Sequence, residues 1–418
     1  MASSAELPAH LQEIIDKGYI MDRVSADELR SGGIHFIDKG GTELRDGAGE
    51  HEGKTVQSVA FCFDGPFLPV RNGASYSLYN LLNALGKDGS VLPILILCDR
   101  GDSVENYYNQ HFKTIFVDPE YYYNHNERTA EIFTKNHISA VQFCSSEGLL
   151  NLGPYVKKLG LKVIFDVQNV DYVLEERLGH SKEVIENAKQ LQVTAINKSD
   201  YILCRSEVDR VQLIELGAQP ERLGVYNGGI DVDAFTPRQE APSGMKLVFL
   251  AHMYYEPNEN ALAFMVREVL PRLRSGYTLT VIGNTPDAVI NQYYDNDAVI
   301  FRQGVDNLSE ELVRYDVAVA PIFEASGTRL KVLDYLAAGV PAVTTDIAIE
   351  GLVEGIKNVV SIANDPDSTV AAIEAIVRNP HDFATRSHNG REYVRSFYDW
   401  KNLLGPFLRA YAGITKDS

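Results

Sequence analysis

The amino-acid sequence predicts an α/β protein with two domains, each an open parallel β-sheet with helices on both faces. Two features of the pattern predict it. From residue 56 onward, short apolar runs of strand length alternate with helical stretches, as in a sheet whose strands are joined by crossover helices. A polar segment with two prolines at 236–246 interrupts this alternation, which then starts again. The chain has 418 residues and is 45% hydrophobic, so both domains have enough apolar material for a core.

The first domain is expected to cover residues 55–238. Its opening strand is the run at 56–63, and the helix that follows at 73–89 ends at a glycine. Its other strands are expected at 90–98, 113–118, 140–144, 162–167 and 201–204. Residues 1–54 are expected to form a partly helical N-terminal extension that ends in a glycine-rich, charged stretch.

The second domain is expected to cover residues 244–395, with helices at about 258–273 and 329–338. Its strands are expected at 246–251, 277–283, 298–304, 317–321, 341–345 and 358–363. Residues 396–418 are expected to form a C-terminal helix that packs back on the first domain. Open parallel sheets bind ligands at the carboxyl ends of their strands. Two such domains therefore predict a ligand in the cleft between them.

The charge and the cysteines restrict the possible partners. Lys and Arg number 39 and Asp and Glu 57, which gives a formal net charge of −18. The sequence shows no basic stripe, which argues against nucleic acid and an anionic membrane surface as partners. No apolar run is long enough to span a membrane, and the N-terminus lacks the apolar core of a signal peptide. We therefore expect a cytoplasmic protein with four reduced core cysteines, which are Cys62, Cys98, Cys144 and Cys204.

Several common site motifs are absent from the sequence: G-x-G-x-x-G after a strand, G-x-x-x-x-G-K-[ST], H-E-x-x-H and G-x-S-x-G. Their absence disfavours dinucleotide binding, P-loop nucleotidases, zincin proteases and α/β hydrolases. One D-x-D occurs, at Asp231 and Asp233. In some sugar transferases this motif holds a metal–diphosphate. Here it follows a strand just before the linker, so we interpret the two residues as part of a turn and expect no metal site.

One segment, 317–345, has a pattern suited to binding an anion. A strand-like run and a loop that ends at Gly327 lead into a helix, with Thr328 as the expected cap and with Arg329 and Lys331 in the first turn. The free amides and the positive dipole end of a helix bind anions. The dipole disfavours cations in that turn by about 0.3–1 kcal/mol each. Two cations there indicate a compensating anion, such as a diphosphate.

A second interpretation of the same residues stays open. Arg329 and Lys331 also fit ordinary surface charges, and Lys331 and Asp334 have the spacing of an i,i+3 ion pair. In the first interpretation, the carboxylate of Asp334 lies one turn into the helix, where it can accept hydrogen bonds from ribose hydroxyls. Spacing alone does not separate the two.

The residues at 327–341, Gly-Thr-Arg-Leu-Lys-Val-Leu-Asp-Tyr-Leu-Ala-Ala-Gly-Val-Pro, resemble the donor-site helix of family 4 glycosyltransferases with the GT-B fold. They are most similar to the bacterial branch with the form G-T-R-x-K-x-L-[ED]-x-x-A-x-G-x-P-V. Other segments resemble the family in the expected order: 66–86, 162–171, 225–235 (VYNGGIDVDAF), 249–271, 279–286 and 302–307. Together they cover about residues 56–395. The resemblance implies two Rossmann-like domains, a nucleoside-diphosphate sugar as co-substrate with no bound cofactor, retention of anomeric configuration and no essential metal.

The resemblance also implies roles for the residues that match the motifs. Arg329 and Lys331 would hold the donor diphosphate and stabilise it as it leaves. Gly327 and Thr328 would add backbone contacts, and Asp334 would bind the ribose. The remaining implied positions are Val305 beside the base, Asn72 and Gly73 facing the donor sugar and acceptor, and Gln168 and Asn169 in the cleft.

Two residues depart from the family pattern. Ser326 stands where a carboxylate normally contacts the sugar hydroxyls, and Glu324 is a nearby substitute. Gln168 stands where many relatives carry histidine. Because glutamine does not titrate, no proton role is expected at that position. The identity of the donor sugar is therefore not implied by the resemblance.

The acceptor is the least defined part of the prediction. An aromatic-rich region of the first domain is interpreted as packing in preference to ring stacking on an acceptor; it contains Tyr107, Tyr108, Phe112, Tyr121, Tyr122, Tyr123 and His125. The acidic net charge favours a soluble, cationic acceptor such as an amino sugar or aminocyclitol over a lipid. Two other functions stay open on the same scaffold: a sugar-nucleotide epimerase, and a two-lobed nucleotide or sugar binder without catalysis.

Overall fold

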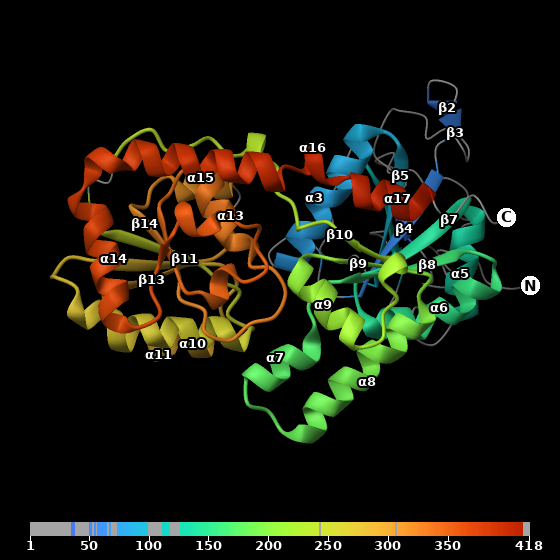
Figure 1. The fold of residues 1–418 in the computed structure, drawn as a ribbon, viewed down its shortest axis with the longest axis horizontal. Coiled ribbons are helices and arrows are strands. Elements are labelled where there is room, and N and C mark those ends of the chain that lie inside the picture. The colour runs from blue at the N-terminus through green and yellow to red at the C-terminus, as the bar shows by residue number, and fades with distance from the viewer. Residues whose placement is uncertain are drawn as a thin grey trace, which may run out of the picture.

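The chain forms two domains that lie side by side, each built on one β-sheet (Figure 1). In this computed structural model the described residues are 35–37, 50–51, 54–55, 57–64, 67, 73–98, 111–117, 126–241, 244–305 and 307–412. Most of the predicted N-terminal extension, residues 1–54, lies outside them.

The first sheet has eight strands in the order β1-β6-β5-β4-β7-β8-β9-β10. All pair in parallel except β1 (His35–Ile37), which lies antiparallel to β6 at one edge. The parallel strands are β4 (Gln57–Phe63), β5 (Val91–Cys98), β6 (Lys113–Val117), β7 (Ile138–Phe143), β8 (Lys162–Val167), β9 (Tyr201–Cys204) and β10 (Leu223–Val225). The order reverses between β4 and β7, which is the topological switch point of a doubly wound sheet.

Helices cover both faces of the first sheet. They are α3 (Gly73–Asp88), α5 (Asn126–Lys135), α6 (Ser146–Lys158), α7 (Asp171–Arg177), α8 (Lys182–Lys198) and α9 (Glu207–Glu215). Successive residues of β4 enter two separate cores, because side chains alternate along a strand. Ala60 and Cys62 belong to one core, and Phe61 and Phe63 to the other. In Figure 1, α7 and α8 project from the body of the domain. A small separate ribbon pairs β2 (Glu50–His51) with β3 (Lys54–Thr55).

The second sheet has six parallel strands in the order β13-β12-β11-β14-β15-β16. They are β11 (Lys246–Leu250), β12 (Thr278–Ile282), β13 (Val299–Arg302), β14 (Val317–Ala320), β15 (Ala342–Thr344) and β16 (Ser361–Ile362). The helices are α10 (Glu256–Phe264), α11 (Asp287–Gln292), α12 (Leu308–Leu312), α13 (Leu330–Ala337), α14 (Pro366–Arg378) and α15 (Phe383–Tyr398). The switch point lies between β11 and β14. The predicted fold class, two parallel-sheet domains in series, is confirmed.

The helix predicted at about 258–273 has a different form in the structure. It begins two residues earlier, at Glu256, and its α-helical part ends at Phe264. A π-helical turn, Met265–Val269, and a 3₁₀ turn, Leu270–Arg272, complete it. Pro271 explains the change at the end, because proline has no N–H to donate to an earlier carbonyl and its ring disfavours a continuing α-helix.

Two chain segments cross between the domains side by side. The backbone N–H of Ile230 donates to the Tyr398 carbonyl at 2.8 Å, and the Trp400 N–H donates to the Ile230 carbonyl at 3.2 Å. Gly229 packs directly against the Trp400 ring, since a Cβ at this position would lie 2.3 Å from the indole. The second glycine of the N-G-G segment is therefore required for a steric reason, because any side chain there would clash with the Trp400 ring.

The C-terminal segment returns to the first domain. After α15, the helices α16 (Trp400–Leu403) and α17 (Gly405–Ala412) run over it (Figure 1). Trp400, Phe407 and Tyr411 are buried in the same core as Phe61 of β4. The first domain is thus completed by the last described residues of the chain.

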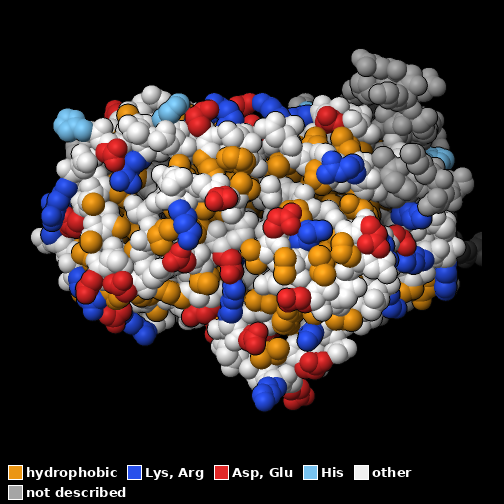
Figure 2. Space-filling view, viewed as in Figure 1, with side chains coloured by type: hydrophobic (Ala, Val, Ile, Leu, Met, Phe, Trp, Pro, Cys, Tyr) orange, Lys and Arg blue, Asp and Glu red, His pale blue; other side chains and the backbone are white. Residues whose placement is uncertain are grey.

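Surface charge, helix hydropathy and the cysteines can be compared with the expectations from the sequence. Acidic and basic side chains are interspersed over the face in Figure 2. Among the described helices, none is both long and apolar enough to cross a bilayer. None of the four cysteines is in a disulfide; Cys62 and Cys204 are buried, and Cys98 and Cys144 are partly exposed.

Candidate functional site

The carboxyl ends of the two sheets meet between the domains. The loop after β8 contacts the loop after β14: the Val170 N–H donates to Ser326 Oγ at 2.9 Å, and the Ser326 hydroxyl donates to the Val170 carbonyl at 3.0 Å. Gly327 lies against the same loop, because a Cβ on it would be 2.6 Å from the Gln168 carbonyl oxygen and from Asn169 Oδ1. The predicted cleft residues Gln168, Asn169, Ser326 and Gly327 are therefore brought together by the fold.

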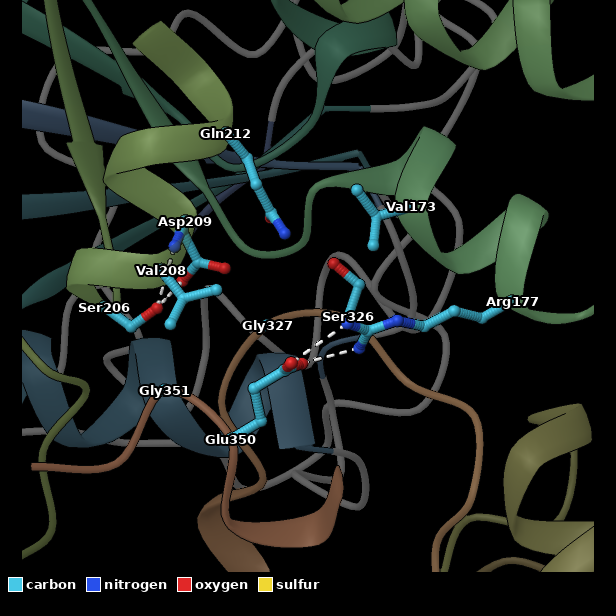
Figure 3. A pocket seen from close by; sticks show the side chains of 10 residues that line it. All are labelled: Val173, Arg177, Ser206, Val208, Asp209, Gln212, Ser326, Gly327, Glu350 and Gly351. Carbon is cyan, nitrogen blue, oxygen red and sulfur yellow. Dashed lines mark hydrogen bonds and ion pairs between the residues drawn. The ribbon is translucent and has the colours of Figure 1, made fainter. Parts of the chain in front are cut away.

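A charged clamp lies beside this contact. Arg177 of α7 donates to both carboxylate oxygens of Glu350, at 2.6 and 3.0 Å, and also to the Ala325 carbonyl. Figure 3 shows the Arg177 and Glu350 side chains directed at each other across the two domains. A bidentate arginine–carboxylate pair is among the stronger polar contacts in proteins. Arg177 and Glu350 were not identified from the sequence, since they are 173 residues apart and match no motif.

The space between the domains at this clamp is small. It has about 200 Å³ and is bordered by α7, α9 and the loops at 326–327 and 350–351 (Figure 3). Sites for small molecules usually have roughly 300–1,000 Å³. The opening between the domains at this clamp is therefore narrower than a typical small-molecule site.

The helix α13 begins at the switch point of the second sheet, where open parallel sheets bind their ligands. Gly327 has φ +71°, a left-handed conformation that favours glycine. The prediction that Thr328 caps the helix is wrong. Arg329 occupies the N-cap position, no side chain caps the first turn, and Thr328 Oγ1 is buried without a hydrogen-bond partner. The amides at this helix end therefore lack the side-chain acceptor that Ser206 supplies to α9.

Arg329 is a buried cation held by carbonyl oxygens. It is 8% exposed, and burial lowers its pKa to about 10. Its three nitrogen atoms donate to the carbonyls of Gly327, Ala348 and Glu350. A guanidinium group has five N–H donors, so three engaged donors leave two for an oxyanion. The interpretation of Arg329 as an ordinary surface charge is therefore wrong.

Asp334 is buried and Lys331 is half-buried, one helical turn apart. Lys331 Nζ donates to Asn258 Oδ1 at 2.7 Å and lies 4.6 Å from the centre of the Phe249 ring. Burial, with Arg329 adding to it, lowers the pKa of Lys331 to about 7. Burial raises the pKa of Asp334 to about 7, while Lys331 opposes the shift. Buried groups with shifted pKa values are typical of functional sites.

Several buried polar atoms around α13 have no partner within the described part of the chain. They are Thr328 Oγ1, Asp334 Oδ1, Glu324 Oε2 and His252 Nδ1. Tyr76 of the first domain lies near this group, since burial and the charge of Asp334 both raise the pKa of its hydroxyl. Leaving a buried polar atom unpaired costs about 1–3 kcal/mol. A cluster of them at one place indicates groups that a ligand satisfies.

The other predicted residues have separate positions. Val305 follows β13 at the same carboxyl edge, three strand positions from β14, or about 14 Å at the usual strand spacing of ~4.8 Å. Gly73 is the first residue of α3, and Asn72 lies outside the described residues. The Gln168 side-chain oxygen accepts a hydrogen bond from Arg205. The Ser326 hydroxyl donates its hydrogen bond to the Val170 carbonyl.

The remaining candidates do not join this site. Asp231 and Asp233 form ion pairs with Lys87 and Lys401. Of the predicted aromatic region, Phe112 is buried and packs edge-to-face on Tyr79 with ring centres 6.0 Å apart. The tyrosines at 107–108 and 121–123 and His125 lie outside the described residues.

Comparison with known proteins relates the chain to sugar transferases. Residues 244–379, less than half of the chain, match the family described as Glycosyl transferases group 1. D-inositol 3-phosphate glycosyltransferase 2 from Catenulispora acidiphila is 21% identical over an alignment of 249 residues, which covers 53% of this chain and 58% of that protein.

Two solved structures are similar over most of the chain. Sucrose-phosphate synthase from Thermosynechococcus elongatus has a TM-score of 0.65 at 14% identity, over 87% of this chain and 100% of that one. HepE from Anabaena, solved in complex with UDP, has a TM-score of 0.63 at 11% identity, over 85% of this chain and 100% of that one. The fold is therefore that of GT-B glycosyltransferases, as predicted, and the second domain carries the similarity to group 1 transferases.

Proposed function

We propose that the protein transfers a sugar from a nucleoside-diphosphate sugar to a hydroxyl group of an acceptor, with retention of anomeric configuration. The observation that carries the proposal is the set of buried, partly unsatisfied polar groups at the start of α13. Thr328 Oγ1 and Asp334 Oδ1 have no partner there, and the cations Arg329 and Lys331 lie between them in the sequence. A diphosphate supplies acceptor oxygens for these groups, and negative charge in addition to the carboxylates of Asp209, Glu350 and Asp334 that act on the two cations.

In this proposal the chain acts mainly on the leaving group. The bond between the sugar carbon and the donor's phosphate oxygen breaks, and its electron pair stays on that oxygen. The uncapped amides of α13, Lys331 and the two spare donors of Arg329 stabilise the developing charge. The same phosphate oxygen then takes the proton of the acceptor hydroxyl, whose oxygen forms the new bond on the same face of the sugar. The scheme calls on no protein base and no metal ion.

The closed contact between the domains supports a role in excluding water. Val170, Gly327 and the Arg177–Glu350 clamp lie at the boundary next to α13. A donor bound there would be shielded from hydrolysis once the domains close. HepE, which shares the fold, was solved with UDP-glucose, so UDP-glucose is a reasonable first donor to test.

The test begins with binding. UDP, GDP, ADP and dTDP are compared by thermal shift, and the nucleotide that binds should stabilise the protein by about 2.7 kcal/mol at a concentration of about 100 Kd. Lys331→Met should abolish the shift, whereas Lys357→Met, a matched control on an exposed lysine of the same domain, should keep it. If none of the nucleotides stabilises the protein, the proposal fails.

The second step is turnover. The corresponding sugar nucleotides are incubated with an acceptor panel that includes inositol phosphates and amino sugars, with and without EDTA, and the product is examined by mass spectrometry and NMR. An α-linked product from an α-linked donor is expected both with and without EDTA. Isomerised sugar nucleotide without acceptor would indicate an epimerase. Nucleotide binding without hydrolysis or transfer on any acceptor would indicate a binding protein.

A further inference from the structure

Arg205 is a buried cation at the cleft end of the first sheet. It directly follows β9 and is 5% exposed. Its Nε–H donates to the Tyr226 hydroxyl at 3.0 Å, and Nη2 donates to the side-chain oxygen of Gln168. Gln168 is the residue whose carbonyl lies against Gly327 of the second domain. Arg205 therefore holds a residue of the cleft loop, 168–170, from inside the first domain.

The hydrogen bonds continue from Arg205 to the C-terminal helix. The Tyr226 hydroxyl donates to Asp166 Oδ1 at 2.9 Å, and Gln142 Nε2 donates to Asp166 Oδ2 at 3.1 Å. The Tyr411 hydroxyl of α17 donates to Gln142 Oε1 at 2.7 Å. Each of these four side chains is at most 2% exposed. The chain of bonds thus joins four strand ends or loops of the first domain to a helix that arrives from the second.

Such a network is costly unless every member is satisfied. The carboxylate of Asp166 balances the charge of Arg205 through Tyr226, and it accepts a bond at each oxygen. Buried charges can often be replaced by packed apolar residues without loss of stability. A buried arginine at a ligand-binding edge therefore points to a role beyond stability, and the group it holds at that edge is the loop 168–170.

We propose that Arg205 is a positioning residue: through Gln168 it holds the loop 168–170 where that loop closes on the donor loop at 326–327, and Tyr411 of α17 secures it. The consequence for catalysis rests on the proposed function. The donor binds mainly to the second domain in that proposal, whereas Val170 is the contact of the first domain with Ser326. Loosening the loop should therefore impair closure and turnover and leave nucleotide affinity intact.

The test compares Arg205→Met and Arg205→Lys with Arg222→Met. Arg222 is a matched control, a half-buried arginine of the same domain that donates to the Ser199 carbonyl. Tyr411→Phe is a milder variant that removes one hydroxyl and keeps the ring. For each protein, kcat, the calorimetric Kd for nucleotide and the hydrogen exchange of a peptide that covers 168–173 are measured. The exchange measurement does not depend on activity.

Arg205→Met should lower kcat about 10- to 100-fold, keep the nucleotide Kd within about twofold and speed exchange at 168–173. Tyr411→Phe should lower kcat by about two- to threefold. Arg205→Lys should recover part of the kcat that Arg205→Met loses, and Arg222→Met should have the kcat and exchange rate of the parent protein. Unchanged exchange and kcat in Arg205→Met would overturn the inference. So would a nucleotide Kd that weakens as much as kcat. If no protein transfers sugar but exchange rises as expected, the positioning role stands and the proposed function fails.

Discussion

Binding of a nucleoside-diphosphate sugar should weaken as the pH rises, because burial lowers the pKa of Lys331 to about 7 from 10.5. A diphosphate beside the amino group favours its charged form and raises its pKa in the complex. Binding therefore takes up a proton at any pH above about 7. Taken alone, the titration of Lys331 then gives a Kd that grows about tenfold per pH unit above that point, or ~30-fold between about pH 6 and about pH 8.5.

Two variants isolate this effect. Lys331→Arg keeps a positive charge at every pH in the range, so its affinity should not fall with rising pH and should be nearly flat above about pH 7. Asp334 needs a separate control, because burial raises the pKa of this carboxyl to about 7 as well. If its carboxylate accepts hydrogen bonds from the ribose, its titration strengthens binding as the pH rises and opposes the effect of Lys331. Asp334→Asn removes that opposing titration, so the slope should be steepest in this variant.

Isothermal titration calorimetry in two buffers with different ionisation enthalpies counts the protons directly. A sugar diphosphate ester has no ionisation of its own between about pH 6 and about pH 8.5, so the protons belong to the protein. About one proton should be taken up near pH 8.5 by Asp334→Asn and none by Lys331→Arg. The same proton uptake and the same slope in Lys331→Arg would refute the assignment to Lys331.

Two further predictions concern the contact between the domains. Gly327→Ala places a Cβ 2.6 Å from two oxygens of the loop 168–170, and it should lower the unfolding free energy by about 1–3 kcal/mol more than Gly160→Ala does. Gly160 is the control, because it has a similar φ and open space around it. Equal losses of stability in calorimetric melting of the two variants would contradict the packing argument. Glu350→Gln removes the charge of the clamp with Arg177 and should weaken closure by about 1 kcal/mol, a roughly fivefold shift toward open forms. Small-angle scattering should then report a larger radius of gyration, and an unchanged radius would show that the clamp does not hold the domains.

The fold was largely predictable because its strands are strongly apolar and its helices carry stop signals. The run Val91–Cys98 is a buried strand as expected, and the restart of the pattern after 236–246 marks the second sheet. The edge strand β1 (His35–Ile37) was not predicted. Its three residues pair antiparallel with β6, and a segment that short carries no periodicity of its own.

The site was predictable only in part. The order of residues in 327–334 indicated where an anion-binding helix begins, and the structure places those residues at the boundary between the domains. The direction of the Arg329 side chain was not predictable, because it depends on carbonyl oxygens of Ala348 and Glu350 in another loop. The pairing of Arg177 with Glu350 is likewise a product of the tertiary fold. Arg205 had one usable signal, its position directly after the predicted strand 201–204 at the ligand-binding edge.

The central claim is that the N-terminus of α13 binds the donor diphosphate, and a crystal structure of the protein with a nucleoside diphosphate tests it most directly. We expect phosphate oxygens within hydrogen-bond distance of the backbone amides of Thr328–Lys331, with Lys331 Nζ turned from Asn258 toward the phosphate. A diphosphate bound elsewhere, with Lys331 still on Asn258 and the amides of α13 unengaged, would contradict the claim.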